Sequence, residues 1–293
     1  MDKYILVIDS NSEIPYQYAD KYDLKVIYMP YFFDGEEEEL YYDLGRKYNP
    51  TEFFDKLKSG KTTITVQKNP HHFIEMFDPY LEQGLDIVYL GFSSKFSGTF
   101  NNAMIAREEL IKTYPQRRIE LIDSAAISVP LTQIVLKAAQ KREEGASIDE
   151  LVKYVNDIKY KFSAIITVND LTYLRRGGRL SGSAAFFGSV LNIKPIIRLN
   201  REGRLVPADK VKGRKKAMSY LVEDVYKNAE DTENNILIIA QADCQEDAIQ
   251  LKNTIDEKMN FKEIWIHNVG PVIGSHCGPG TLAVSYYGKE RED

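Results

Sequence analysis

The sequence predicts an α/β protein in two domains, the first a doubly wound, mainly parallel sheet and the second an α/β domain with antiparallel pairing. Its 293 residues are enough for about two domains of roughly 100–200 residues each. Strand-like and helix-like patterns alternate through the first half, which is typical of parallel βαβ units. Near residue 162 this alternation stops, and a turn at residues 200–203 joins two short strands as a hairpin. We therefore place the domains at residues 1–160 and 161–293.

The first half is expected to alternate apolar strands with capped helices. Strands are predicted at residues 4–8, 24–28, 86–91 and 118–122, and helices at 51–60, 70–81, 98–112, 128–141 and from 147 onwards. Thr51 is a suitable N-cap for the first helix, and Asn69-Pro70 places an N-cap before a proline in the first turn. Ser147 and Glu150 have the spacing of a capping box.

The second half is expected to contain shorter strands and fewer helices. Strands are predicted at residues 162–168, 193–199, 205–211, 235–240 and 263–267, and helices near 213–228 and 245–258. A further helix near residues 182–191 consists almost entirely of small or apolar side chains. The pattern fits either a core helix or the wall of an apolar channel.

Composition excludes several classes of protein. Apolar residues make up 43% and charged residues 28%, as in ordinary globular proteins. The N-terminal apolar run is too short for a signal peptide, and no stretch approaches the ~18–20 apolar residues of a membrane span. We expect a soluble cytoplasmic protein without stable membrane insertion, which leaves transient membrane contact open. Cys244 and Cys277 form no CxxC motif, so neither a disulfide scaffold nor a zinc site is indicated.

The net charge of −5 is unevenly distributed. Residues 175–216 contain twelve Lys and Arg against two acids, whereas residues 34–43 are strongly acidic. Each segment is either a solvated face or, for the basic one, a surface that attracts an anionic partner or phosphate. Nucleic acid is not expected as a partner, because the sequence pI is about 5.6 and no binding motif is present.

Polar residues follow three predicted parallel strands, at Asp9, Ser93 and Asp123. Ligands of such sheets bind at the carboxyl ends of the strands, so we expect these loops to border a site. The densest polar stretch, residues 91–99, opens a helix and contains Ser93, Ser94 and Ser97. Hydroxyls and free N–H groups at a helix start form an anion site, although Ser97 also fits as a simple N-cap.

Three further segments are candidates for ligand contacts. Thr62 and Thr63 lie in a predicted loop, and this observation is weak because threonine pairs are common in loops. His276 lies in a glycine-rich turn, residues 274–280, where it either hydrogen-bonds a ligand or has a structural role. Residues 175–179 form a compact basic turn whose guanidinium groups match carboxylate and phosphate geometry.

Taken in order, these segments resemble the DegV family across nearly the whole chain. The matching stretches are Asp9-Ser10, Lys61-Thr62-Thr63, residues 93–99 (Ser-Ser-Lys-Phe-Ser-Gly-Thr), Asp123-Ser124, residues 173–180 (Tyr-Leu-Arg-Arg-Gly-Gly-Arg-Leu), residues 191–197 (Leu-Asn-Ile-Lys-Pro-Ile-Ile) and residues 276–280 (His-Cys-Gly-Pro-Gly). The Leu-Arg-Arg-Gly-Gly-Arg and Asn-Ile-Lys-Pro stretches are the most specific.

The resemblance implies a two-domain protein with a long-chain fatty acid buried between the domains and no cofactor. It also implies that the protein presents the carboxylate to a separate ATP-dependent fatty acid kinase subunit and has no catalysis of its own. The implied carboxylate contacts are Thr62, Thr63, Ser93 or Ser94, Ser97 and His276. From the charge of the basic turn we expect Arg175, Arg176 and Arg179 to contact the partner or a phosphate. One departure is that family members often continue the threonine loop with a Ser-Gln-Pro-Ser-Pro-like stretch, whereas residues 63–67 read Thr-Ile-Thr-Val-Gln.

Other functions stay open at this point. A stand-alone lipid carrier or sensor would have the same site and no kinase partner. A Ser/His hydrolase or acyltransferase would use Ser93, Ser94 or Ser97 with His276, but the chain has no Gly-x-Ser-x-Gly elbow and no clear acidic partner for the histidine. A dinucleotide-binding oxidoreductase is disfavoured because no Gly-x-Gly-x-x-Gly follows the first strand.

Overall fold

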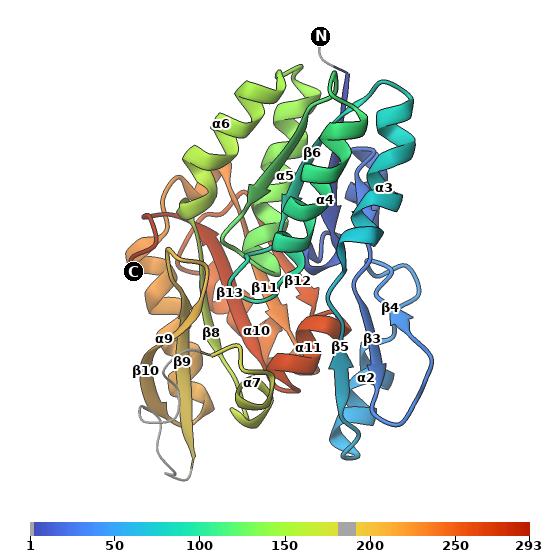
Figure 1. The fold of residues 1–293 in the computed structure, drawn as a ribbon. Helices are drawn as coiled ribbons and strands as arrows, with labels where there is room; N and C mark the ends of the chain where they lie inside the picture. The colour runs from blue at the N-terminus through green and yellow to red at the C-terminus, as the bar shows by residue number, and fades with distance from the viewer. Residues whose placement is uncertain (1–2, 181–191) are drawn as a thin grey trace.

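The computed structural model describes residues 3–180 and 192–293, and its named strands form three sheets (Figure 1). The first sheet is parallel throughout, with the order β2-β1-β6-β7. Its strands are β1 (Tyr4–Asp9), β2 (Lys25–Ile27), β6 (Asp86–Gly91) and β7 (Ile119–Asp123). The predicted α/β class is therefore confirmed. The helix expected near residues 182–191 lies outside the described residues.

Helices connect the strands of the first half of the chain (Figure 1). They are η1 (Ser10–Ser12), α1 (Tyr16–Lys21), α2 (Pro50–Lys58), α3 (Pro70–Glu82), α4 (Thr99–Thr113), α5 (Val129–Glu143), α6 (Ile148–Ile158) and η2 (Lys159–Lys161). The predicted caps hold for α3, where the Asn69 side chain accepts from the His72 N–H, and for the capping box of α6. The predicted N-cap of α2 was wrong: Pro50 takes the first helical position, so Asn49 rather than Thr51 caps the helix.

A small antiparallel sheet lies beside the first one and was not predicted. It has the order β4-β3-β5, with β3 (Pro30–Phe33), β4 (Leu40–Tyr41) and β5 (Thr63–Thr65). Thr63, expected in a loop, is therefore in a strand, and it pairs with Phe33. Strands of two to four residues are too short for their periodicity to be recognised in the sequence.

The second half forms a mixed sheet of order β10-β9-β8-β13-β11-β12. Its strands are β8 (Phe162–Thr167), β9 (Ile193–Leu199), β10 (Leu205–Lys212), β11 (Ile236–Gln241), β12 (Glu263–Asn268) and β13 (Leu282–Tyr287). The hairpin between β9 and β10 is confirmed, and among the described strand pairs of this mixed sheet only β11–β12 is parallel. Strand β13 was not predicted, although it lies inside the sheet between β8 and β11.

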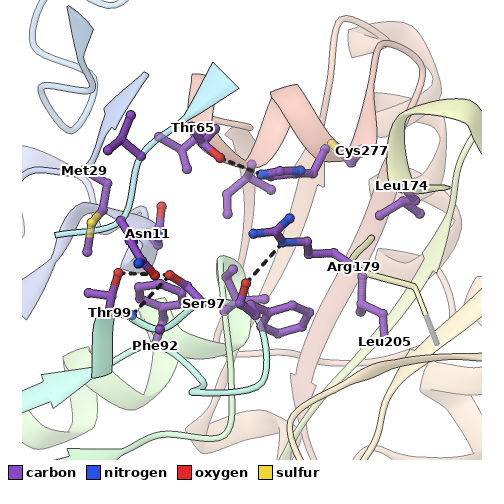
Figure 2. Close-up of a pocket in the computed structure, with 18 residues that line it drawn as sticks. Asn11, Met29, Thr65, Phe92, Ser97, Thr99, Leu174, Arg179, Leu205 and Cys277 are labelled. Atoms are coloured by element: carbon purple, nitrogen blue, oxygen red, sulfur yellow. Dashed lines mark hydrogen bonds between the residues drawn. The ribbon is translucent and has the colours of Figure 1, made fainter. Parts of the chain in front are cut away.

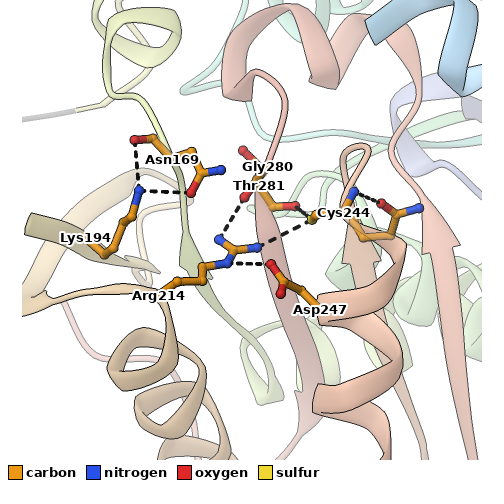
Figure 3. A network of polar contacts seen from close by, with 8 residues as sticks. Asn169, Lys194, Arg214, Cys244, Asp247, Gly280 and Thr281 are labelled. Carbon is orange, nitrogen blue, oxygen red and sulfur yellow. Dashed lines mark hydrogen bonds and ion pairs between the residues drawn. The ribbon is translucent and has the colours of Figure 1, made fainter. Parts of the chain in front are cut away.

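Among residues 162–180 and 192–293, the helical segments that accompany this sheet are α7 (Thr172–Gly177), α9 (Arg214–Asn228), η3 (Thr232–Asn234), α10 (Gln245–Asp256) and α11 (Pro271–Cys277). Helices α9 and α10 confirm the prediction, whereas α7 and α11 occupy segments expected to be turns. A polar network fixes the chain just after α11 (Figure 3). Arg214 of α9 donates from Nη1 to the Gly280 carbonyl and forms an ion pair from Nε with Asp247, both at 2.8 Å.

One hydrophobic core runs through both halves of the chain. It contains β1 and β6 residues such as Leu6 and Val88, and it continues into the second half through Phe162, Ala240 and Ala283. A second cluster, around Leu221 of α9, fills the opposite face of the mixed sheet. No described helix is both long enough and apolar enough to cross a bilayer. The boundary between domains 1–160 and 161–293 stays a prediction.

Glu13 joins the two halves at the turn that follows β1. Its buried carboxyl group accepts hydrogen bonds from the Gly270 N–H and the Ser128 hydroxyl. Gly270 is the N-cap of α11 and Ser128 the N-cap of α5. Burial raises the pKa of Glu13 to about 7, and the two hydrogen bonds offset only part of this effect.

The raised pKa predicts how stability depends on pH. Between about pH 4.5 and pH 7 folded Glu13 keeps a proton that the unfolded chain has released, so rising pH favours unfolding. Glu13→Gln keeps an acceptor for the Gly270 N–H, replaces the acceptor of the Ser128 hydroxyl by an amide that donates to it, and has no proton to lose. The stability of E13Q relative to the parent should therefore rise by up to about 1.4 kcal/mol per pH unit across that window. Denaturant unfolding at pH 5, 6, 7 and 8 measures it, and a constant difference would contradict the buried acid.

Candidate functional site

The loops at the carboxyl edge of the parallel sheet are held by Asp9. Its buried carboxyl group accepts from the backbone N–H groups of Asn11 and Phe92 at 3.0 Å and from the Tyr89 hydroxyl at 3.1 Å. Burial raises the pKa of Asp9 to about 7 despite these three bonds. Asp9 thus fixes the turn after β1 and the loop after β6 relative to each other, as parallel strands ending at one edge lead us to expect.

A cavity of about 260 Å³, the outer cavity, opens between this edge, β5, α7 and α11. Its polar wall comes from both halves of the chain (Figure 2) and consists of Asn11, Thr65, Gln67, Ser97, Thr99, Arg179 and His276. Apolar side chains such as Met29, Phe92 and Leu205 make up much of the remaining wall. Convergent polar groups in a mainly apolar hollow are the usual form of a small-molecule site.

His276 lies in the last turn of α11, and its Nε2 is 3.0 Å from the Thr65 hydroxyl. Burial, together with the positive charges of Arg179 and Arg176, lowers the pKa of His276 to about 4. The imidazole is therefore neutral near pH 7 and acts as a hydrogen-bonding group rather than as a cation. The prediction of a glycine-rich turn at residues 274–280 was partly wrong, because residues 274–277 form the last part of α11.

The two glycines of the Arg-Arg-Gly-Gly-Arg stretch lie at the end of α7, and the structure explains why each is glycine. A Cβ on Gly177 would lie 2.3 Å from Nδ1 of His276, so only glycine lets α7 approach the imidazole this closely. Gly178 has a φ of 66° and ends α7 in the left-handed conformation. The helix therefore stops directly beside the histidine.

The arginines of this stretch take different positions. The Arg179 guanidinium points into the outer cavity (Figure 2) and donates from Nε to the Phe96 carbonyl at 3.1 Å. Arg175 and Arg176 are exposed, and Arg176 lies over the Tyr173 ring. Much of the other charge in residues 175–216 is neutralised by ion pairs, namely Arg198–Asp224, Arg201–Glu290, Arg204–Glu202 and Arg214–Asp247.

Ser97 and Thr99 lie at the start of α4, across the outer cavity from Thr65 (Figure 2). Their hydroxyls are 3.0 Å apart, and the Thr99 N–H donates to Ser97 Oγ at 3.2 Å. The N-cap residue of α4 is Gly98, which has no side-chain cap, so the simple N-cap expected at Ser97 was wrong. Ser97 instead lies one residue before the cap, where its Oγ accepts from the Thr99 N–H, and it lines the outer cavity.

The other two serines of the loop do not line the outer cavity. Ser93 is buried and donates from its hydroxyl to the Gly203 carbonyl at 2.9 Å, which ties the loop to the β9–β10 hairpin. Ser94 is exposed, and its N–H donates to Asp123 Oδ2 at 3.2 Å. The structure therefore gives Ser93 a contact between the halves of the chain.

Thr65, rather than Thr62 or Thr63, reaches the histidine. Thr62 donates to Asp34 at 3.3 Å, and the buried Thr63 hydroxyl has no partner among the described residues. Neither of these two lines the outer cavity. Counting the family's threonine loop from Thr65 also places its Ser-Gln-Pro-Ser-Pro-like stretch on residues 66–70, where Gln67 and Pro70 match. That spacing is the signal that the sequence reasoning missed.

A second, apolar cavity of about 70 Å³, the inner cavity, adjoins the outer one. The two share lining from Ile127, Leu174, Leu205, Ile273 and Cys277. The remainder of the inner wall is almost wholly apolar and comes from the first turn of α5 and the facing strands of the mixed sheet. A polar mouth thus leads into an apolar interior.

Comparison with known proteins gives a consistent result over the full length. A profile of the DegV family of uncharacterised proteins matches residues 3–289. A DegV domain-containing protein of Clostridium perfringens is 38% identical over 292 residues, covering 100% of both chains. One from Streptococcus pyogenes serotype M1 is 31% identical over 287 residues, covering 98% of each.

Solved structures of similar fold include proteins described as binding fatty acids. A fatty-acid-binding DegV family protein of Thermus thermophilus superposes with a TM-score of 0.87 at 27% identity, over 98% of this chain and 100% of that one. A fatty acid binding DegV family protein of Streptococcus agalactiae gives a TM-score of 0.86 at 27% identity, over 99% and 100%.

The close contact at Gly177 predicts a selective effect of mutation. Gly177→Ala should displace the His276 ring and break its bond to Thr65, at a cost of about 1–3 kcal/mol in stability. Gly178→Ala is the matched control, because its Cβ meets open space and only the backbone is strained, by about 1 kcal/mol. NMR of the histidine ring protons should show a shifted His276 signal in G177A only. Equal spectra in both variants would contradict the packing described above.

Proposed function

Because this chain belongs to the DegV family, we propose that it binds a long-chain fatty acid, with the carboxylate in the outer cavity and the acyl chain in the inner one. The observation that carries the proposal is that the outer cavity, with its polar wall, adjoins the almost wholly apolar inner cavity. Relatives of the same fold described as fatty-acid-binding support it. The finer assignment of contacts and of a partner is part of the same proposal.

The carboxylate would lie between the Thr65–His276 pair and the Ser97–Thr99 pair. An unpaired carboxylate in an apolar site costs several kcal/mol, so hydroxyls and a neutral imidazole at hydrogen-bonding distance are the groups it requires. Arg179, whose guanidinium points into the same cavity, would supply the opposite charge. Ser93, Ser94, Thr62 and Thr63 would then act indirectly or not at all.

The acyl chain would supply most of the affinity. About sixteen carbons at roughly 0.8 kcal/mol per buried methylene give on the order of 10 kcal/mol before the costs of binding. The inner cavity is apolar apart from Ser128 and Thr281, whose hydroxyls already donate to Glu13 and to the Cys277 carbonyl, so an acyl chain would leave neither of them unpaired. The ligand is therefore expected to be long and unbranched, without internal polar groups.

We propose a binding subunit rather than an enzyme. A hydrolase would need an acidic partner for His276, but the charged groups that shift its pKa are both arginines. The exposed Arg175 and Arg176, beside the cavity, would instead favour a partner that carries nucleotide phosphates, such as a fatty acid kinase subunit. A stand-alone carrier or sensor would have the same lipid site but would not contact a kinase subunit.

The lipid site is tested by mass spectrometry of the material that organic solvent extracts from the purified protein. The parent protein should release about one equivalent of C14–C18 fatty acid. Thr65→Ala and His276→Ala should lower retention about tenfold, since each removes one hydrogen bond to a charged group. Thr62→Ala is the matched control and should retain the lipid. Loss in T62A with retention in T65A would restore the sequence-based assignment, and an empty parent that takes up no added fatty acid would refute the function.

The kinase role is tested separately. Arg175→Glu with Arg176→Glu should leave the bound fatty acid unchanged and lower acyl phosphate formation by a fatty acid kinase subunit about tenfold, because the phosphate-facing charge is reversed. Acyl phosphate is measured as hydroxamate after trapping. Ester hydrolysis by the parent alone would favour the hydrolase, and absence of phosphate transfer with lipid bound would favour the carrier.

A further inference from the structure

We infer that the inner cavity ends at a buried polar pair, Gln133 of α5 and Ser285 of β13, and that Gln133 acts as the stop that limits acyl-chain length. This inference rests on the proposed function, because it assigns the far end of the same ligand. It is carried by the strand register of the mixed sheet and by the hydrogen bonds of the pair.

The floor of the inner cavity is a pair of alanines. Ala283 of β13 pairs with Ala240 of β11 across the sheet, and both line the inner cavity. Residues alternate between the two faces of a strand, so the neighbours Leu282 and Val284 belong to the cluster on the opposite face. Two adjacent methyl side chains leave room above the sheet at this level.

The next level along β13, on the same face, carries a polar side chain beside Ala164, which also lines the inner cavity. Ser285 is fully buried, and its hydroxyl hydrogen-bonds to Oε1 of Gln133, which is also buried. The amide nitrogen of Gln133 donates to the Ile236 carbonyl at 2.7 Å. Gln133 lies one helical turn beyond Val129 and Pro130, which line the inner cavity. The same helix face that forms the wall therefore carries the stop.

Aromatic rings close the level beyond that. Tyr287 of β13 pairs with Phe162 of β8, and their rings meet edge to face with centroids 5.4 Å apart. Side-chain bulk on this face of β13 thus increases from Ala283 through Ser285 to Tyr287. An acyl chain that enters past Cys277 meets the open level at Ala283 first and the Gln133–Ser285 pair next. Beyond that pair the aromatic rings leave no room.

The hydrogen bonds make the stop rigid. Moving Gln133 aside would leave the buried Ser285 hydroxyl without its partner and would break the bond to the Ile236 carbonyl. One additional methylene gains less than that penalty, so a longer chain does not displace the glutamine. An apolar side chain in its place would block by bulk alone.

The experiment compares the fatty acids retained by the full-length protein and its variants after exposure to an equimolar C12–C20 mixture, measured by mass spectrometry. Ala283→Leu adds three carbon atoms to the floor and should shift the preferred length down by about three carbons in a close-packed interior. Gln133→Ala with Ser285→Ala removes the stop and should shift it up by about two to four carbons. Gln133→Leu with Ser285→Ala keeps the bulk and should retain the parent length.

The outcomes separate the inference from the function on which it rests. A parent that retains no fatty acid refutes the proposed function itself. A parent that retains fatty acid, with the same length profile in A283L and Q133A/S285A, refutes the stop and leaves the function intact. Equal lengthening in Q133A/S285A and Q133L/S285A also refutes it, because bulk would then be irrelevant. If A283L does not fold, Ala240→Val makes a smaller change to the same floor and should shorten the preferred chain.

Discussion

The turn after β1 is the constraint on which the site depends, because its two buried carboxyl groups fix the segments around it. Asp9 holds the backbone of Asn11 and Phe92, which line the outer cavity. Glu13 holds Gly270 and Ser128, where α11 and α5 begin. Since α11 carries His276 and α5 carries Gln133, one short turn sets the positions of both ends of the combined cavity.

The sequence alone was sufficient to predict the strands and helices whose hydrophobic pattern is long and regular. Apolar runs such as Asp86–Gly91 and capped helices such as Ile148–Ile158 were predicted because burial and capping are local properties. Strand β13 and helix α11 were missed because glycine and proline surround them, and because their structure depends on partners far along the chain. Strands β3 and β5 pair at a separation of about thirty residues, which no local pattern reveals.

The candidate site was predictable as a set of segments but not residue by residue. The serine loop, the arginine stretch and the histidine do converge, and Ser97, Arg179 and His276 line the outer cavity. Thr65 could not be chosen over Thr62 and Thr63 without knowing how β5 pairs with β3. Ser93 has the residue type of a ligand contact, yet its hydroxyl bonds to the β9–β10 hairpin. Which hydroxyl faces a cavity is decided by packing between segments, and that information is not local.

The core that runs from β1 to β13 has a consequence for how the molecule holds together. By topology the parallel sheet and the mixed sheet differ in construction, but Phe162, Ala240 and Ala283 are packed in the same apolar cluster as Leu6 and Val88. Separating the halves would expose that shared surface to water, so each half relies on the other as its solvent-excluding partner. We therefore expect the chain to unfold in a single cooperative transition, although its architecture has two parts.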